Sequence, residues 1–173
     1  MEKRILKFYN PVLRKKAKKV DLDEKTGELI AEMKNAMKER DGIGLAAPQI
    51  GESKRIIIAG TEEEAVTLLN PEIKEKGKEK IVTKEGCLSL PGIWLDVARP
   101  RYIKVKALDE SGREFEAEAE DIFAVVLQHE IDHLDGKLFI DRVDFFTKMK
   151  TLFRYFFQRI FPLKEKKLVG KEN

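Results

Sequence analysis

Residues 121–136 read Asp-Ile-Phe-Ala-Val-Val-Leu-Gln-His-Glu-Ile-Asp-His-Leu-Asp-Gly, and the organisation of the chain follows from this stretch. Its apolar side chains recur at helical spacing up to Leu134, and Gly136 ends the pattern. His129 and His133 lie one helical turn apart, so both imidazoles share one face of the expected helix. A helix with this apolar stripe is mostly buried, and we therefore expect a covered helix that presents two metal-binding side chains.

The histidines belong to an H-E-x-x-H motif, His-Glu-Ile-Asp-His at 129–133. In such a motif two imidazoles reach one metal ion, and the intervening Glu130 moves a proton to or from water bound beside it. The chain has two histidines in all, and both fall in the motif, which favours a shared role. The alternative is a chance match in which each histidine is an ordinary core residue with a satisfied hydrogen bond.

A catalytic metal needs a third protein ligand, and no further histidine exists to supply it. Cys87 is the best candidate, because it lies in Glu-Gly-Cys-Leu-Ser-Leu-Pro-Gly (85–92), which we expect to be a loop after a short strand. Flanking glycines there permit close backbone approach to an ion. Asp135, Asp141 and Asp144 remain alternatives. A lone cysteine also commonly serves as a small buried apolar residue, which is the competing interpretation.

A third segment, Gly-Ile-Gly-Leu-Ala-Ala-Pro-Gln at 42–49, is apolar and rich in glycine. It is no phosphate loop, because no Gly-Lys-Ser/Thr follows it. Small residues here allow a strand-like backbone to lie close to a ligand. Gln49 is polar within this apolar run, and its spacing alone is compatible with a functional side chain or with a solvent-facing loop residue.

The rest of the chain alternates between helical and strand-like patterns. The expected elements are a helix within 21–40, strands at 55–59, 65–69 and 81–83, a hairpin of 102–108 with 113–119, and an amphipathic helix at 144–161. This order predicts an α+β fold. We expect one domain over residues 1–173, with a core at 1–145 and an amphipathic helix and basic tail at 146–173.

Composition excludes several classes of protein. The chain has 173 residues, 42% hydrophobic and 38% charged, without an apolar stretch long enough to span a membrane. No apolar segment follows the charged N-terminus, so we expect no secretory signal. The single cysteine excludes an internal disulfide framework and suits a reducing compartment. These features predict a cytoplasmic protein.

Charge is distributed unevenly along the chain. Residues 1–19 hold eight Lys/Arg against one Glu, and residues 148–173 hold eight against two, so the middle carries 18 basic and 28 acidic side chains. The simpler interpretation is a set of solvated faces, and the alternative is an anionic partner.

Taken together, GIGLAAPQ (42–49), EGCLS (85–89) and QHEIDHLDG (128–136) make the sequence resemble the peptide deformylase family. The resemblance extends over roughly residues 3–145. It implies an α+β fold in which antiparallel sheets wrap around a metal-bearing helix. It also implies hydrolytic removal of the formyl group from the N-terminal formyl-methionine of nascent polypeptides, with release of formate.

The same resemblance implies roles for individual residues. Cys87, His129 and His133 would bind one divalent metal ion, and Glu130 would act as general acid and base. Two imidazoles and a thiolate suit Zn²⁺, Ni²⁺, Co²⁺ or Fe²⁺. The family points to Fe²⁺ as the native ion.

On the substrate side, the resemblance implies that the Gln49 amide and the backbone N–H of Leu88 form an oxyanion hole. The backbone of Ile43, Gly44 and Gly86 would pair with the substrate main chain like an added strand. The predicted walls of the methionine pocket, for which ordinary core packing is the alternative, are Ile43, Ile122 and Val125.

Two rival functions stay open from the residues alone. One is a zinc peptidase of the H-E-x-x-H type that cuts unblocked peptides, although a suitable downstream Glu or His ligand is missing. The other is a non-catalytic metal-binding protein, which would have no need of Glu130. We expect no DNA partner.

The stripe of the last helix consists of Phe145, Phe146, Met149, Leu152, Phe153, Phe156, Phe157, Ile160 and Phe161. It has three interpretations: packing on the protein's own sheets, which we expect, a dimer contact, or a membrane surface. The basic residues beyond it, Lys164, Lys166, Lys167 and Lys171, are candidates for contact with ribosomal RNA near the exit of the nascent chain.

Overall fold

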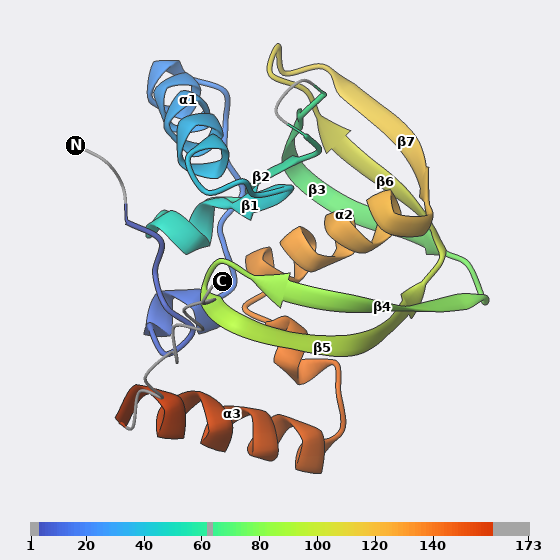
Figure 1. The fold of residues 1–173 in the computed structure, drawn as a ribbon. Coiled ribbons are helices and arrows are strands. Elements are labelled where there is room, and N and C mark those ends of the chain that lie inside the picture. Colours follow the sequence, from blue (N-terminus) through green and yellow to red (C-terminus); the bar gives the residue numbers. More distant parts are fainter. Residues whose placement is uncertain (1–3, 62–63, 161–173) are drawn as a thin grey trace, which may run out of the picture.

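The computed structural model describes residues 4–61 and 64–160, with side chains up to residue 157 (Figure 1). The α-helices in this part are α1 (Glu24–Lys38), α2 (Asp121–Leu134) and α3 (Phe145–Ile160). The strands are β1 (Gly44–Ala46), β2 (Ile56–Ala59), β3 (Val66–Lys76), β4 (Lys80–Cys87), β5 (Leu90–Pro100), β6 (Tyr102–Leu108) and β7 (Glu114–Glu120). Short 3-10 helices are η1 (Pro11–Arg14), η2 (Ala47–Ile50) and η3 (Phe139–Asp141).

Two antiparallel sheets enclose α2. One has the strand order β1-β2-β3-β6-β7, and the other is the β4-β5 pair. In Figure 1 α2 crosses between the five-stranded sheet and the long β4-β5 hairpin. Side chains of α2 such as Leu127 and Ile131 pack with Ile57 and Val105 of the larger sheet. The predicted α+β fold with sheets around the H-E-x-x-H helix is confirmed.

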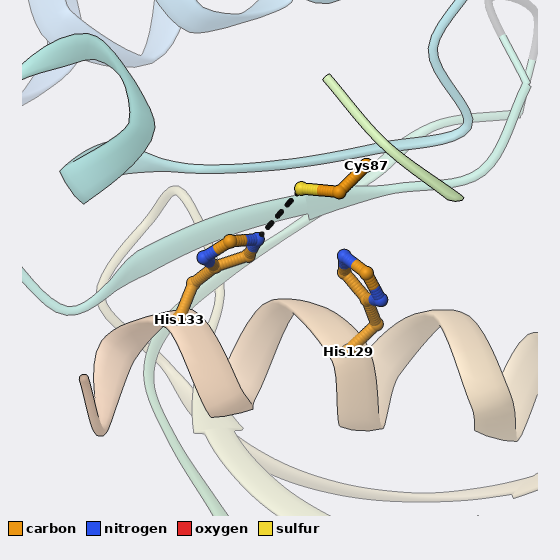
Figure 2. A group of neighbouring side chains, drawn as sticks. All are labelled: Cys87, His129 and His133. Atoms are coloured by element: carbon orange, nitrogen blue, oxygen red, sulfur yellow. Dashed lines mark hydrogen bonds between the residues drawn. The ribbon is translucent and has the colours of Figure 1, made fainter. Parts of the chain in front are cut away.

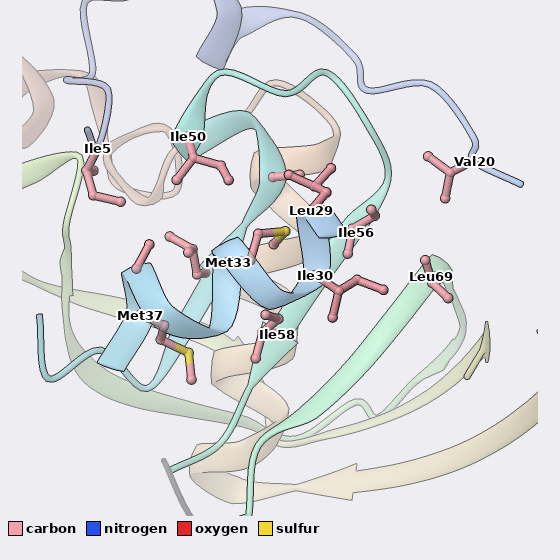
Figure 3. Packing of buried hydrophobic residues seen from close by; sticks show 13 residues of the cluster. Ile5, Val20, Leu29, Ile30, Met33, Met37, Ile50, Ile56, Ile58 and Leu69 are labelled. Carbon is pink, nitrogen blue, oxygen red and sulfur yellow. The ribbon is translucent and has the colours of Figure 1, made fainter. Parts of the chain in front are cut away.

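Helix α1 covers the other side of β1 and β2 (Figure 3). It begins at Asp23, whose carboxylate accepts a hydrogen bond from the backbone N–H of Thr26 at 2.7 Å. Met33 is fully buried, and it packs in one cluster with Ile56 and Ile58 of β2. This packing holds β1, and with it the segment 42–49, in place.

Strand β3 is longer than predicted. We expected it to end before Asn70 and Pro71, but it continues to Lys76 through a register shift between Leu69 and Glu72. Asn70 adopts a left-handed backbone (φ 52°), and its side chain bonds both the N–H and the carbonyl of Val20, at 2.9 and 2.7 Å. The irregularity accommodates a proline that a regular strand would exclude.

The β4-β5 hairpin corrects a second expectation. Only 81–83 was predicted as a strand here, and residues 85–92 as a loop. Instead, β4 runs as far as Cys87, a turn at Leu88 and Ser89 follows, and β5 starts at Leu90. Pro91 and Gly92, which suggested a loop, lie in β5, where Gly92 has a positive φ of 77° that a side chain would strain.

Helix α3 packs differently from the expected arrangement. Thr151 and Tyr155 are buried, and the Tyr155 ring meets the edge of Phe8 at 5.1 Å. Most of the predicted stripe, by contrast, faces outward: Phe146 is 81% and Phe153 71% exposed, and Leu152 alone packs against a core cluster among its described members. The expectation that the phenylalanines of this stripe pack on the protein's own sheets is therefore wrong, because Thr151 and Tyr155 of the opposite face make the buried contacts. The side chain of Ile160 lies outside the described part. Phe161 lies outside the described residues.

None of the helices in the described ranges is both long and apolar enough to cross a membrane.

Candidate active site

The two histidines of α2 meet Cys87 at the end of β4 (Figure 2). The Cys87 Sγ atom lies 3.2 Å from His133 Nε2. One ligand atom from each of Cys87, His129 and His133 lies within 4.8 Å of the others, as required for a shared ion. Among the described residues this is the one group of three such ligands that lies close enough, and none of its members is exposed. The arrangement follows from the helical spacing of the histidines and from the hairpin that carries Cys87 over α2.

Electrostatics at this cluster favour a thiolate. Burial by itself raises the pKa of Cys87, but His133 and His129 outweigh it, and the pKa lies well below its usual value. Burial lowers the pKa of His129, but hydrogen bonds to Cys87 and Glu85 outweigh it, and the pKa lies well above its usual value. The thiolate is the form of cysteine that binds metal ions, so the donor set fits a cation.

Glu85 holds the outer nitrogen of His129. Its Oε2 atom lies 2.8 Å from His129 Nδ1, and both side chains are buried. A carboxylate on the far nitrogen of an imidazole fixes which nitrogen faces a metal and how the ring is oriented. The sequence analysis did not assign this role to Glu85. The signal in the sequence was the position of Glu85 two residues before Cys87, the proposed thiolate ligand. Its partner His129, however, lies 44 residues further along the chain.

A buried arginine binds both carboxylate oxygens of Glu85. Arg99 of β5 donates from Nε to one Glu85 oxygen at 2.5 Å, and from Nη2 to the other at 3.0 Å. Its third bond, at 2.8 Å, goes to Asp132 of α2, which Arg142 also contacts. Buried charges are tolerated when each one is paired in this way. The network joins β4, β5 and α2 beneath the cluster and holds Glu85 against His129.

Glu130 points into the site from α2. It is buried, and its Oε2 atom has no hydrogen-bond partner among the described residues. Burial raises the pKa of Glu130 to about 7, so the carboxyl group can take up and release a proton near neutral pH. An unpartnered buried oxygen beside a cysteine-histidine cluster is suited to bind water there.

Gly44 leaves the space that Glu130 occupies. A Cβ atom built on Gly44 would lie 2.5 Å from Glu130 Oε1, closer than real Cβ contacts allow. Strand β1 is thus able to pass directly over the carboxyl group because it has a glycine at this position. The same strand lies at the edge of the five-stranded sheet, which leaves one side of its backbone without a neighbouring strand.

The Gln49 amide is aimed at Cys87. Its Oε1 atom accepts from the Ala46 backbone N–H at 2.8 Å, which orients the amide. Its Nε2 atom then lies 3.5 Å from Cys87 Sγ and 3.4 Å from Ser89 Oγ. Gln49 is 1% exposed, so the interpretation as a solvent-facing loop residue is wrong. Leu88 occupies the adjoining turn between β4 and β5.

A cavity of about 530 Å³ opens beside the cluster. Apart from His133, the cavity is lined by every residue predicted from the sequence to serve in metal binding, catalysis or substrate binding: Ile43, Gly44, Gln49, Gly86, Cys87, Leu88, Ile122, Val125, His129 and Glu130. Ile43 and Ile122 are 55% and 57% exposed, so they are not ordinary core residues, whereas Val125 is 5% exposed.

Trp94 forms a further wall of this cavity. It is 61% exposed, and its indole lies over Gly86, where an added Cβ atom would come within 2.9 Å of the ring. Trp94 was not among the site residues predicted from the sequence. An exposed tryptophan next to a cavity is a signal for ligand contact, but its position over Gly86 depends on how β4 pairs with β5.

The three aspartates considered as alternative metal ligands form ion pairs or hydrogen bonds with other groups. Asp135 binds Arg55 at 2.8 Å, and Asp141 pairs with Arg14 and Lys148. The Asp144 carboxylate accepts from the first backbone N–H groups of α3 at 3.0 Å, as a helix cap does.

Comparison with known proteins identifies this architecture. The family model described as polypeptide deformylase matches residues 2–149. The chain is 46% identical over 142 residues to the peptide deformylase of Caldicellulosiruptor bescii, covering 82% of this chain and 85% of that protein. It is 49% identical over 140 residues to that of Clostridium botulinum, covering 80% and 94%.

Solved structures agree. A crystal structure of a peptide deformylase from Legionella pneumophila superposes with a TM-score of 0.85 at 39% identity, covering 92% of this chain and 97% of that one. The structure from Thermotoga maritima gives a TM-score of 0.80 at 44% identity, covering 83% and 99%. With the family model matched over residues 2–149 and with these identities over most of both chains, this chain belongs to the polypeptide deformylase family.

Proposed function

We propose that Cys87, His129 and His133 hold the divalent cation with which the chain removes the formyl group from the N-terminal methionine of nascent polypeptides. Membership of the family supports the reaction. The observation that carries the ligand set is the meeting of Cys87 with both histidines of α2, within 4.8 Å of one another. The Cys87 thiolate and the two imidazoles would supply the three protein ligands that are typical of a catalytic ion.

The identity of the ion is a finer proposal. The donor set suits Fe²⁺, Zn²⁺, Ni²⁺ or Co²⁺, and we propose Fe²⁺ in the cell on the strength of the family resemblance. When bound, such an ion acidifies water and polarises the formyl carbonyl. If the ion is Fe²⁺, activity decays in air and survives anaerobic handling, because iron and thiolate both oxidise. Equal activity after aerobic and anaerobic preparation, with iron bound throughout, would contradict the assignment.

Glu130 is the proposed general acid and base. Its unpartnered Oε2 atom takes the proton of the attacking water, and the same carboxyl group then delivers a proton to the departing amine. A pKa of about 7, raised by burial, suits both transfers at neutral pH. Gly44 keeps this carboxyl group free of a neighbouring side chain.

Gln49 and Leu88 are the proposed oxyanion donors. The bond from Ala46 orients the Gln49 amide so that its NH₂ group points toward the cluster. The backbone N–H of Leu88 lies in the turn that immediately follows Cys87. One such donor is typically worth about 3 kcal/mol of transition-state stabilisation.

The substrate main chain is proposed to add to the open edge of β1. Ile43, Gly44 and Gly86 line the cavity, and we propose that their backbone groups pair with the substrate main chain in strand-like fashion. Ile122 and Val125 supply apolar walls for the methionine side chain. A formyl carbon carries only hydrogen, so a tight site excludes the bulkier acetyl group by sterics.

Paired peptides test the function. We expect hydrolysis of formyl-methionyl peptides with release of formate, and no cleavage of the same peptides without the formyl group. Cys87→Ser is expected to lose tightly bound metal, measured by elemental analysis after desalting, and to lose turnover with it. Cleavage of unblocked peptides would favour the zinc peptidase, while metal binding without any turnover would favour a non-catalytic protein. A Cys87→Ser variant with normal metal content would refute the ligand assignment.

The basic tail and the compartment remain proposals as well. Lys164, Lys166, Lys167 and Lys171 lie outside the described residues, and we propose that they contact ribosomal RNA in the cytoplasm. Deleting residues 164–173 should leave turnover on short formyl peptides intact and reduce co-sedimentation with ribosomes at low salt, where phosphate contacts are strongest. Unchanged co-sedimentation would show that the tail makes no contact with the ribosome.

A further inference from the structure

Helix α3 presents a continuous apolar surface that the rest of the described chain does not cover. We call it the aromatic face of α3: Phe145, Phe146, Met149, Phe153, Phe156 and Phe157. Each of these side chains is between 47% and 81% exposed. The Phe153 and Phe157 rings stack on each other at 6.0 Å, and the Phe145 and Phe146 rings meet at 5.9 Å. Soluble monomers rarely leave so many large apolar side chains side by side in water.

The buried residues that attach α3 to the body lie opposite this face, and Phe156 touches Phe8 at its edge. Thr151 and Tyr155, on the opposite side of the helix, are buried, and the Tyr155 ring packs against Phe8. Asp144 caps the first turn, and Asp141 binds Lys148. The helix is therefore held with its aromatic face outward, which points to an occupant outside the described chain.

The surroundings of the aromatic face are basic. Residues 145–160 contain no Asp or Glu, and Lys150 and Arg154 are exposed beside the aromatic side chains. Phe8 lies 5.8 Å from Phe156, which brings the N-terminal segment alongside α3. That segment adds exposed cations at Arg4, Lys15 and Lys16. The described part of α3 and the N-terminal segment beside it are thus both rich in exposed cations.

The basic charge and the apolar surface of α3 together indicate which partner binds its aromatic face. A second copy would bring two acid-free basic helices face to face, and like charges would oppose that contact. An RNA partner would meet the cations, but its unpaired bases stack on individual rings and would cover these crowded phenylalanines only in part. An anionic lipid surface satisfies both features, because aromatic side chains enter the boundary between headgroups and acyl chains while Lys and Arg meet lipid phosphates.

We propose that the aromatic face of α3 binds the surface of an anionic phospholipid bilayer, with the helix lying in the interface and not crossing it. No residue of α3 lines the active-site cavity, so docking leaves the cavity open. This inference does not depend on the deformylase chemistry, and its failure would leave the proposed function intact.

The test uses the full, metal-loaded chain and vesicle flotation. We expect binding to vesicles of phosphatidylglycerol and phosphatidylcholine, weak binding to phosphatidylcholine alone, and loss of binding at high salt. Phe146→Ser with Phe153→Ser should weaken binding at least tenfold, because two exposed rings no longer leave water on binding. The matched control is Val82→Ser, which removes an apolar side chain that is 68% exposed on β4, and it should bind like the parent chain.

A second variant separates charge from apolarity. Lys150→Glu with Arg154→Glu keeps the aromatic face and should abolish the preference for anionic vesicles. Turnover on a short formyl peptide, which should stay unchanged in every variant, shows that each has folded. Vesicle binding unaffected by the phenylalanine substitutions would overturn the proposal. So would a dimer in solution that these substitutions disperse without any vesicle binding, or RNA binding with none to vesicles.

Discussion

Helices α2 and α3 carry similar patterns of apolar residues and have opposite surroundings. From Ala124 to Leu134 nearly every side chain of α2 is buried, including both histidines and Glu130. On α3 the largest apolar side chains are the most exposed ones, and Thr151 faces the protein. Helical spacing therefore indicates that a stripe exists, but the neighbouring elements decide whether it is covered.

The consequence is a difference in chemistry. Polar groups in α2 lie in a low-dielectric interior, so each one either has a partner or is poised for a ligand. Asp132 is paired, whereas the Glu130 Oε2 atom is not. On α3 the exposed groups are phenylalanine rings, which gain from association with an apolar surface. Substitutions in the two regions test this contrast between buried polar groups and exposed rings.

Glu130→Gln should lower turnover of formyl peptides by about 10² to 10⁴, the range for removal of a general acid or base. The amide retains the shape of the carboxylate but cannot accept the proton. Metal content should stay at the parent level, because the three ligands are untouched. Turnover close to that of the parent chain would remove Glu130 from the mechanism.

Glu85→Gln should weaken metal binding by about 10- to 100-fold, the usual cost of losing the group that orients a ligating histidine. Competition with a chelator measures the affinity, and circular dichroism establishes that the variant is folded. Glu79→Gln is the matched control, because Glu79 also pairs with an arginine but is exposed and remote from the cluster. Equal metal affinity in Glu85→Gln and Glu79→Gln would show that His129 needs no such support.

Gly44→Ala should reduce kcat by about tenfold while metal stays bound, because the new Cβ atom would push the Glu130 carboxyl group from its place. Gly27→Ala is the control: a Cβ atom there meets nothing within 4 Å. In the interior of α1 that substitution should raise stability by about 0.5–1 kcal/mol and leave kcat unchanged. Parent-like turnover in Gly44→Ala would mean that the carboxyl group tolerates displacement.

The smallest effect is expected on α3. Phe146→Ala should change the free energy of unfolding by less than about 0.5 kcal/mol, since an exposed ring loses little on truncation. Phe139→Ala, in which a buried ring is removed next to His129, should cost about 3–5 kcal/mol. Denaturant unfolding of both variants compares them directly. A large loss of unfolding free energy in Phe146→Ala would show that the aromatic face contributes to the stability of the fold.

Local spacing predicted much of this molecule. The helices at α1, α2 and α3 follow from apolar periodicity, and the β6-β7 hairpin follows from alternation around a Ser-Gly turn. The H-E-x-x-H pair shares a face because one helical turn separates its histidines. These features depend on residues close together in sequence, so the sequence alone was sufficient to predict them.

Contacts between distant segments were beyond such prediction. Strand β5 was missed because Pro91 and Gly92 interrupt its pattern, and its pairing with β4 places Arg99 behind Glu85. Glu85 reaches His129 across 44 residues. No periodicity records such an encounter, since it depends on strand register and on how the hairpin crosses α2.

The sequence by itself determined where helices and most strands form, and which residues offer metal-binding atoms. Only the tertiary structure decided which of these side chains meet, which are buried and which face solvent. The physical reason is that secondary structure depends on local backbone geometry and spacing, whereas burial depends on which surface another element covers. For α2 both sheets supply that cover, and for the aromatic face of α3 no described element does.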